Sequence, residues 1–204
     1  KLAEAAPGTY QHTLSVASIS ERCAGAIMAN PLLAKVGALF HDIGKIPKPE
    51  YFAENQIDME NKHNLLSPRK SAEAIRQHVI EGIKLGHEYK LPQRIIDFIP
   101  SHHGTTLIKH FYAMALEQSL DKSNVHEEDF RYPGPKPYNK ENAIVMVCDF
   151  SEALSRLDNI NKDDFERAIT SNIRERLLDG QFDECTITMK DLEIIKDICV
   201  KTLM

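Results

Sequence analysis

Histidine and aspartate residues recur at widely separated points of the chain, and together these residue types bind metal ions. Imidazole nitrogens and carboxylate oxygens suit borderline divalent ions such as Mn, Fe, Co and Zn. Taken singly, an inward histidine is an ordinary hydrogen-bonded core residue, and Asp149 could equally accept backbone hydrogen bonds or pair with an arginine. Together, on helical faces that should converge, they favour a two-metal site. The candidate ligands are His12, His41, Asp42, His78, His102, His103 and Asp149.

The stretch ALFHDIGKIPKP, residues 38–49, shows why a cation is expected. Its apolar start leads directly into His41 and Asp42, and a buried carboxylate is costly unless a positive group meets it. We expect a metal ion to be that positive group, and the two oxygens of Asp42 could bridge two ions. Lys45 follows one turn later, where its ammonium group could hold a phosphate oxygen. The other interpretation of Lys45 is a solvated side chain.

The spacing of apolar residues predicts an all-α fold that brings these residues together. Val16, Ile19 and Cys23 form one helical stripe that includes His12. The helix that carries Asp149 is apolar almost all round in its first two turns, which predicts a central position. The predicted helices span residues 9–29, 32–43 (ended by Gly44), 67–89, 92–102, 107–118, 141–157, 162–178 and 189–203, with irregular segments at 50–66 and after 118.

Composition limits the class of protein and of ligand. The 204 residues suit a single domain, 1–204, and the net charge of -5 gives no footprint for a nucleic-acid polymer. The four cysteines show no CxxC spacing and lie mostly in apolar helical stretches, which favours buried, reduced thiols in an intracellular chain over disulfides. No apolar run is long enough to span a bilayer. Because the chain begins at Lys1, we expect a piece of a longer protein.

The order His, His-Asp, His, His-His, Asp resembles the HD-domain metal-dependent phosphohydrolases, and HDIGK matches their motif with its following lysine. The resemblance extends over most of residues 10–160 to the catalytic domain of PgpH-type cyclic di-AMP (c-di-AMP) phosphodiesterases. Those are bacterial membrane proteins whose cytosolic HD domain follows a seven-helix membrane region. The resembling segments are HDIGKIPKPEYFAENQ, LSPRKSAEAIRQHVIEGIKLGHEYKLPQRIIDFIPSHHGTTLI, FRYPGPKP and AIVMVCDFSEALSRL.

This resemblance implies a helical HD bundle with a two-metal site in its core, at the cytoplasmic face of a membrane and with its membrane anchor outside these residues. It implies hydrolysis of c-di-AMP to 5′-pApA by a hydroxide shared between two ions, with Mn or Fe favoured. It assigns His12, His41, Asp42 and Asp149 to one ion, and His78, His102 and His103 to the second, with Asp42 bridging. The segment GTTLIKHFYA after His103 lacks the Gly-Tyr-Pro signature of the related HD-GYP enzymes, which act on cyclic di-GMP.

Groups around the metals are expected to bind the substrate. Asp42 and Lys45 are the candidate catalytic residues. Candidates for substrate contact are Lys45, Arg131 and Lys136 at phosphates, and Tyr132, Tyr51 or Phe52 stacked on adenine. The remaining histidines, His63, His87, His110 and His126, are interpreted as surface residues.

Two other functions stay open. An HD nucleotide phosphohydrolase acting on deoxynucleotides or guanosine alarmones needs only the one-metal set, which leaves His78, His102 and His103 unexplained. A non-catalytic sensor of cyclic dinucleotides is the second, although degenerate HD domains usually lack ligands that this chain retains. The oligomeric state is open, with a homodimer among the options.

Overall fold

The computed structural model describes residues 1–56, 61–157 and 159–204. Within them the regular elements are helices, and the only β pairing is an isolated bridge between Leu107 and Arg131. The predicted all-α class is therefore confirmed. The α-helices are α1 (Leu2–Ala5), α2 (Pro7–Ala26), α3 (Pro31–Phe40), α4 (Pro68–Glu88), α5 (Gln93–Ile96), α6 (Phe98–Ser101), α7 (Lys109–Gln118), α8 (Lys140–Ser155), α9 (Lys162–Leu178) and α10 (Met189–Leu203). The 3-10 turns are η1 (Ile43–Lys45), η2 (Pro49–Tyr51), η3 (Ala53–Asn55), η4 (Lys62–Leu65), η5 (Lys122–Asn124) and η6 (Glu127–Phe130).

Helix α3 is shorter than its predicted range and ends at Phe40. Its start is as expected, because the side chain of Asn30 accepts a hydrogen bond from the Leu33 amide ahead of a proline. The end, however, is set by tertiary contact. A Cβ on Gly44 would lie 1.8 Å from the His78 carbonyl oxygen. The backbone at Gly44 therefore packs directly against α4, and the chain leaves the helix before this residue to reach that position. Gly44 is thus part of η1 and not the residue that ends α3.

The predicted helix 92–102 is two short helices, α5 and α6, which meet at Asp97. Pro100 explains the break, since its ring would clash with the carbonyl of Ile96 and it has no amide hydrogen for that carbonyl. The Asp97 side chain accepts hydrogen bonds from Tyr138 at 2.6 Å and Gln93 at 2.7 Å. The break leaves the paired histidines just past the end of α6.

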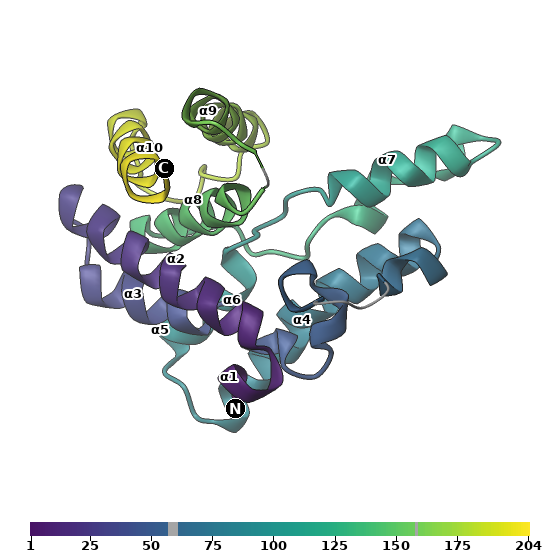
Figure 1. The fold of residues 1–204 in the computed structure, drawn as a ribbon, viewed down its shortest axis with the longest axis horizontal. Coiled ribbons are helices and arrows are strands. Elements are labelled where there is room, and N and C mark those ends of the chain that lie inside the picture. Colours follow the sequence, from purple (N-terminus) through teal and green to yellow (C-terminus); the bar gives the residue numbers. More distant parts are fainter. Residues whose placement is uncertain (57–60, 158) are drawn as a thin grey trace.

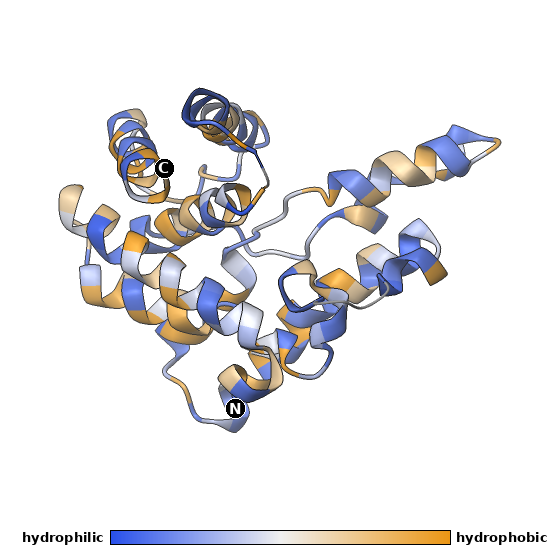
Figure 2. Ribbon diagram, viewed as in Figure 1, coloured by the Kyte–Doolittle hydropathy of each residue, from blue (hydrophilic) through white to orange (hydrophobic). Residues whose placement is uncertain are grey.

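Helix α8 is central, as predicted, and residues 142–148 on it are all buried. Helices α2 and α3 lie on one side of it and α9 and α10 on the other (Figure 1). Apolar and polar bands alternate along α2, α3 and α10 (Figure 2), as in helices that bury one face. This packing holds Asp149 against α2 and α3.

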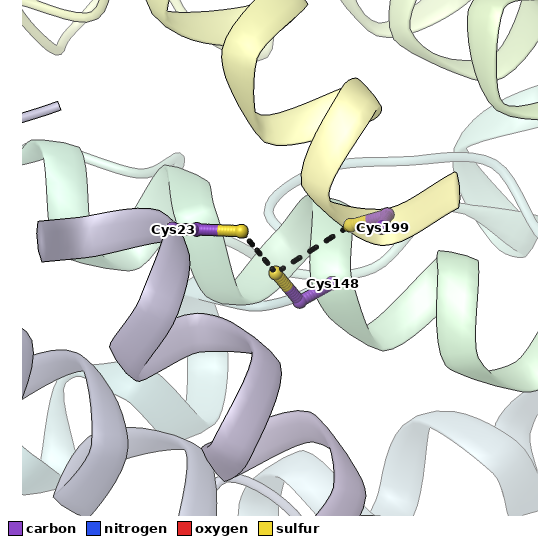
Figure 3. A group of neighbouring side chains, drawn as sticks. All are labelled: Cys23, Cys148 and Cys199. Atoms are coloured by element: carbon purple, nitrogen blue, oxygen red, sulfur yellow. Dashed lines mark hydrogen bonds between the residues drawn. The ribbon is translucent and has the colours of Figure 1, made fainter. Parts of the chain in front are cut away.

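Three thiols meet in this core. Cys148 Sγ lies 3.8 Å from Cys23 Sγ and 4.0 Å from Cys199 Sγ, joining α8 to α2 and α10 (Figure 3). All three are fully buried among apolar side chains and are free thiols, as expected. Cys185 is also free but only half-buried. We assign the three thiols to core packing, where cysteine behaves as a small hydrophobic residue.

The other half of the molecule is built around α4. Helix α7 projects outward beside it (Figure 1), and the segment after α7 returns to the body of the protein. The Ile108 amide donates to the Phe130 carbonyl at 2.9 Å, and the Tyr132 amide to the Thr106 carbonyl at 3.0 Å. The long loop after α7 therefore runs alongside the segment that follows His102 and His103. No helix of the described residues is both long enough and apolar enough to cross a bilayer.

Candidate metal centre

The first group of candidate ligands comes from three helices. His12 lies on α2, His41 and Asp42 follow the end of α3, and Asp149 lies on α8. His12 Nε2 is 2.9 Å from Asp149 Oδ1, and His41 Nε2 is 3.6 Å from the same oxygen. His41 Nε2 is also 3.3 Å from Asp42 Oδ2. Residues 137 positions apart thus meet within hydrogen-bonding distance.

The second group is formed by α4 and the turn after α6. Ligand atoms of His78, His102 and His103 lie within 4.8 Å of one another. From the sequence alone, His78 could lie either in the core or at its boundary. In the structure its side chain is buried. His103 is half-buried, and its ring stacks on that of Tyr132 at 4.1 Å.

Asp42 lies between the two groups, and each of its oxygens faces one of them. Oδ2 is 3.3 Å from His41 Nε2 and 3.7 Å from His12 Nε2. Oδ1 is 3.6 Å from the Nε2 atoms of both His78 and His102. A carboxylate in this position can bridge two cations.

The histidine rings are held so that Nε2 faces inward. Nδ1 of His41, His78 and His102 each lies 2.6 Å from the carbonyl three residues earlier, the donor–acceptor distance of a strong hydrogen bond. In a neutral ring such a contact fixes the tautomer and places the lone pair on Nε2, as in metal-binding histidines. The Nε2 atoms of His41, His78 and His102 and Oδ1 of Asp42 are buried without a hydrogen-bond partner among the described residues. Buried polar atoms in such numbers fit a site that could hold a cation.

The electrostatics divide the histidines into two kinds. Burial lowers the pKa of His102 to about 3 and that of His78 below its ordinary value, so both imidazoles are neutral, the metal-binding form. Burial also disfavours the charged form of His41, yet Asp42 and Asp149 together raise its pKa to about 10. Burial acts against ionised Asp42, but Lys45 and His41 hold its pKa well below the usual range. Ionised carboxylates therefore face neutral nitrogens at the second group.

Glu152 is a functional candidate that the sequence analysis missed. It lies one turn after Asp149 on α8, is 3% exposed, and its carboxylate is hydrogen-bonded to Nδ1 of His12. Arg156 holds the same carboxylate through Nε, 2.9 Å from Oε1. A carboxylate behind a ligand histidine orients the ring and raises its basicity. The sequence feature that could have revealed Glu152 is its position three residues after Asp149, which places both acids on the same face of the helix.

Lys45 is not the solvated residue of the alternative interpretation. Its ammonium lies 2.7 Å from Asp42 Oδ2 and 2.8 Å from Glu54 Oε1, over the ring of Phe52 at 4.8 Å. Burial acts against the charge, but the two carboxylates raise the lysine pKa above its ordinary value. The chain thus supplies a positive partner for Asp42 where only a metal ion was expected.

The other substrate-contact candidates fall into two places. Tyr132 lies at the centre, against His103, and Phe52 lies edge-on to His78 at 5.5 Å. The guanidinium of Arg131 is engaged by acids, with Nη2 2.9 Å from Asp179 Oδ1 and Nε 2.7 Å from Glu127. The remaining candidates are Lys136, half-buried beside Gly180, and Tyr51, whose ring meets that of His63 at 5.4 Å.

The histidines interpreted as surface residues are exposed in three cases, His87, His110 and His126. His63 is the exception. It is half-buried, with Nε2 2.9 Å from the Tyr51 carbonyl oxygen and its ring 4.9 Å from that of Phe111. Its polar sequence neighbourhood concealed this packing, which links η4 to α7.

A helical bundle with a His-Asp pair at the end of one helix and further histidines converging on it defines the HD class. Residues 9–154 match the family model of the HD domain, and the chain belongs to this family. HD domains bind divalent metals, and the buried nitrogens and carboxylates described above fit such ions. The predicted family membership is confirmed.

Within the family, the chain is similar to PgpH proteins. It is 44% identical to the cyclic-di-AMP phosphodiesterase PgpH of Bacillus subtilis, over 98% of this chain and 28% of that protein. The PgpH of Listeria monocytogenes is also 44% identical, over 100% of this chain and again 28% of the relative. The chain thus spans just over a quarter of the length of these relatives. The crystal structure of the L. monocytogenes PgpH HD domain in complex with c-di-AMP superposes with a TM-score of 0.94 at 43% identity, covering 99% of this chain and 94% of that one.

Proposed function

We propose that this chain is a metal-dependent phosphodiesterase domain that hydrolyses c-di-AMP to 5′-pApA. The observation that carries the proposal is the position of Asp42, with one oxygen toward the unpartnered Nε2 of His41 and the other toward those of His78 and His102. A one-metal nucleotide phosphohydrolase needs no second group, and a sensor needs no ligand set at all. The similarity to PgpH proteins supports c-di-AMP as the substrate.

Two divalent transition metal ions, Mn or Fe, are the proposed cofactors. His12, His41, Asp42 and Asp149 would hold one ion, and His78, His102 and His103 would hold the other, with Asp42 shared. Bound there, two ions supply an activated water molecule and neutralise charge on a phosphoryl oxygen. Nitrogen-rich ligand sets of this kind favour transition metals over Mg or Ca.

The residues around the ions bind and orient the substrate. Lys45 stays cationic between Asp42 and Glu54, and its ammonium is a fixed positive charge beside Asp42 that a phosphate oxygen could meet. Glu152 fixes the His12 ring from behind. Tyr132 and Phe52 flank the second group and offer aromatic faces to an adenine base.

We place the domain, residues 1–204, at the cytoplasmic face of a membrane as part of a longer protein whose anchor lies outside these residues. Support comes from the lengths of the PgpH relatives, of which it spans 28%. Localisation of the full-length gene product, followed by protease protection in inverted and right-side-out vesicles, tests this placement.

The function is tested by incubating the purified domain with Mn²⁺ or anaerobic Fe²⁺ and separating the nucleotides by chromatography. The proposal expects c-di-AMP to disappear, 5′-pApA to accumulate, and EDTA to stop the reaction. Cleavage of a deoxynucleoside triphosphate or of a guanosine alarmone with c-di-AMP intact would indicate the nucleotide phosphohydrolase. Tight c-di-AMP binding without cleavage would indicate the sensor.

A further inference from the structure

Arg176 is a buried cation that neither the metal centre nor the fold explains. It lies near the end of α9 and is only 9% exposed. Its Nε is buried without a hydrogen-bond partner, and no side-chain hydrogen bond within the described ranges compensates its charge. Its guanidinium lies 5.2 Å from the centre of the Phe150 ring. Because burying an unpaired charge is costly, such a residue points to an anionic ligand.

The surroundings of Arg176 place it beside the metal centre. Phe150, which its guanidinium covers, directly follows the candidate ligand Asp149. Burial lowers the pKa of Arg176 to about 10, and the negative charges of Asp149 and Glu175 oppose this. Neither carboxylate pairs with Arg176, since Asp149 is bonded to His12 and Glu175 to Lys109.

Arg176 also lies outside the range that matches the HD family model. The family match ends at residue 154, whereas α9 begins at Lys162. The candidate metal ligands and Lys45 all lie inside the matched range. Helix α9 therefore adds a cation to a centre that already carries what the cleavage of one phosphodiester requires.

We infer that Arg176 binds the phosphodiester of the cyclic dinucleotide that is not being cleaved. This inference rests on the proposed function. A cyclic dinucleotide carries two phosphodiesters, and the metal centre can act on only one of them at a time. A planar guanidinium with free donors suits the oxygens of the other. Arg131, the arginine expected from sequence, has its donors engaged by Glu127, Asp179 and the Thr105 carbonyl.

The test compares two substrates in matched variants. Arg176→Gln removes the cation, Arg176→Lys keeps a charge without the planar fork, and Arg174→Gln changes an exposed arginine on the same helix. Each is assayed on c-di-AMP and on bis(p-nitrophenyl) phosphate, a diester with a single phosphate. Binding of c-di-AMP to the EDTA-treated protein is measured by equilibrium dialysis. Thermal melting and metal content report on folding and on the centre.

For Arg176→Gln we expect KM for c-di-AMP and the dialysis Kd to rise about 10- to 100-fold, as for loss of a charged hydrogen bond. The kcat should change less than about threefold, and kcat/KM on bis(p-nitrophenyl) phosphate should stay at the parent value. The KM and Kd of Arg176→Lys for c-di-AMP should lie between those of the parent and those of Arg176→Gln. The values for Arg174→Gln should match those of the parent.

Equal losses on both substrates in Arg176→Gln and Arg176→Lys, or unchanged c-di-AMP binding in both, would overturn the role of Arg176 while leaving the proposed function intact. A parent protein that neither binds nor cleaves c-di-AMP would overturn both. If Arg176→Gln melts at a lower temperature than the parent, the role of Arg176 is judged from the comparison of the two substrates in Arg176→Lys.

Discussion

The ammonium of Lys45 lies 2.7 Å from Oδ2 of Asp42, three residues earlier in the chain. The carboxylate that is proposed to bridge two cations therefore also has a covalently tethered cation at its edge. Glu54, 2.8 Å from the same ammonium, holds it from a second side. A phosphate bound at the centre would meet this ammonium as well as the ions.

Replacing Lys45 by methionine should lower kcat for c-di-AMP about 100-fold, the usual cost of removing one charge-stabilising donor. The metal content should stay near that of the parent, since Lys45 is not a ligand. Steady-state kinetics and elemental analysis of the same samples check this. Lys48→Met, a change at an exposed lysine in the same segment, is the control. Parent-like turnover in Lys45→Met would show that the lysine only balances Asp42.

Glu152→Gln should weaken metal binding about 10- to 100-fold, because the carboxylate that orients His12 is lost. The melting temperature of the metal-free protein should change far less than the metal affinity. Metal titration in a competing chelator measures the affinity. Glu117→Gln, on the exposed face of α7, should behave as the parent. Identical metal affinity in parent and Glu152→Gln would contradict the supporting role.

Gly44→Ala should destabilise the protein by about 3 kcal/mol or more, since the added methyl would lie 1.8 Å from the His78 carbonyl and 2.4 Å from the Gly82 amide nitrogen. These are backbone atoms, so η1 must move, and Asp42 and Lys45 with it. Activity should fall together with stability. Gly25→Ala is the matched control, because its methyl would meet only the Pro31 ring at 3.8 Å. That change should stabilise α2 by roughly 0.5–1 kcal/mol. Chemical denaturation of both variants measures the change in the free energy of unfolding.

Acid should remove a stabilising contact at Asp179. Hydrogen bonds from Arg131 lower the pKa of this carboxyl below 3.8, its value in the unfolded chain. A lowered folded pKa means stability that is present above pH 3.8 and lost as the pH falls through the folded value. Asp179→Asn should therefore melt below the parent at pH 7, and the gap should narrow below pH 3.8. Asp183→Asn, at an exposed neighbour, is the control, and a gap between Asp179→Asn and the parent that does not depend on pH would contradict the account.

Local sequence patterns predicted the helices and the convergence of the candidate ligands, because stripes and caps are encoded within a few residues. Helices α9 and α10 occupy residues 162–178 and 189–203, as predicted. The early end of α3 could not be predicted, since it depends on contact between Gly44 and α4. Nor could the roles proposed for Glu152 and Arg176. Periodicity indicates which face of a helix is buried, but not which partner from another helix meets a charged side chain there.

The central claim is that two cations lie on either side of the Asp42 carboxylate. The most direct test is crystallography of the Mn-loaded protein, with an anomalous difference map from data collected at the Mn edge. The account predicts two peaks about 3.5–4 Å apart. One should lie within bonding distance of His12, His41 and Asp149, and the other within bonding distance of the remaining three histidines, with Asp42 touching both. A single peak, or two peaks that Asp42 does not join, would contradict it.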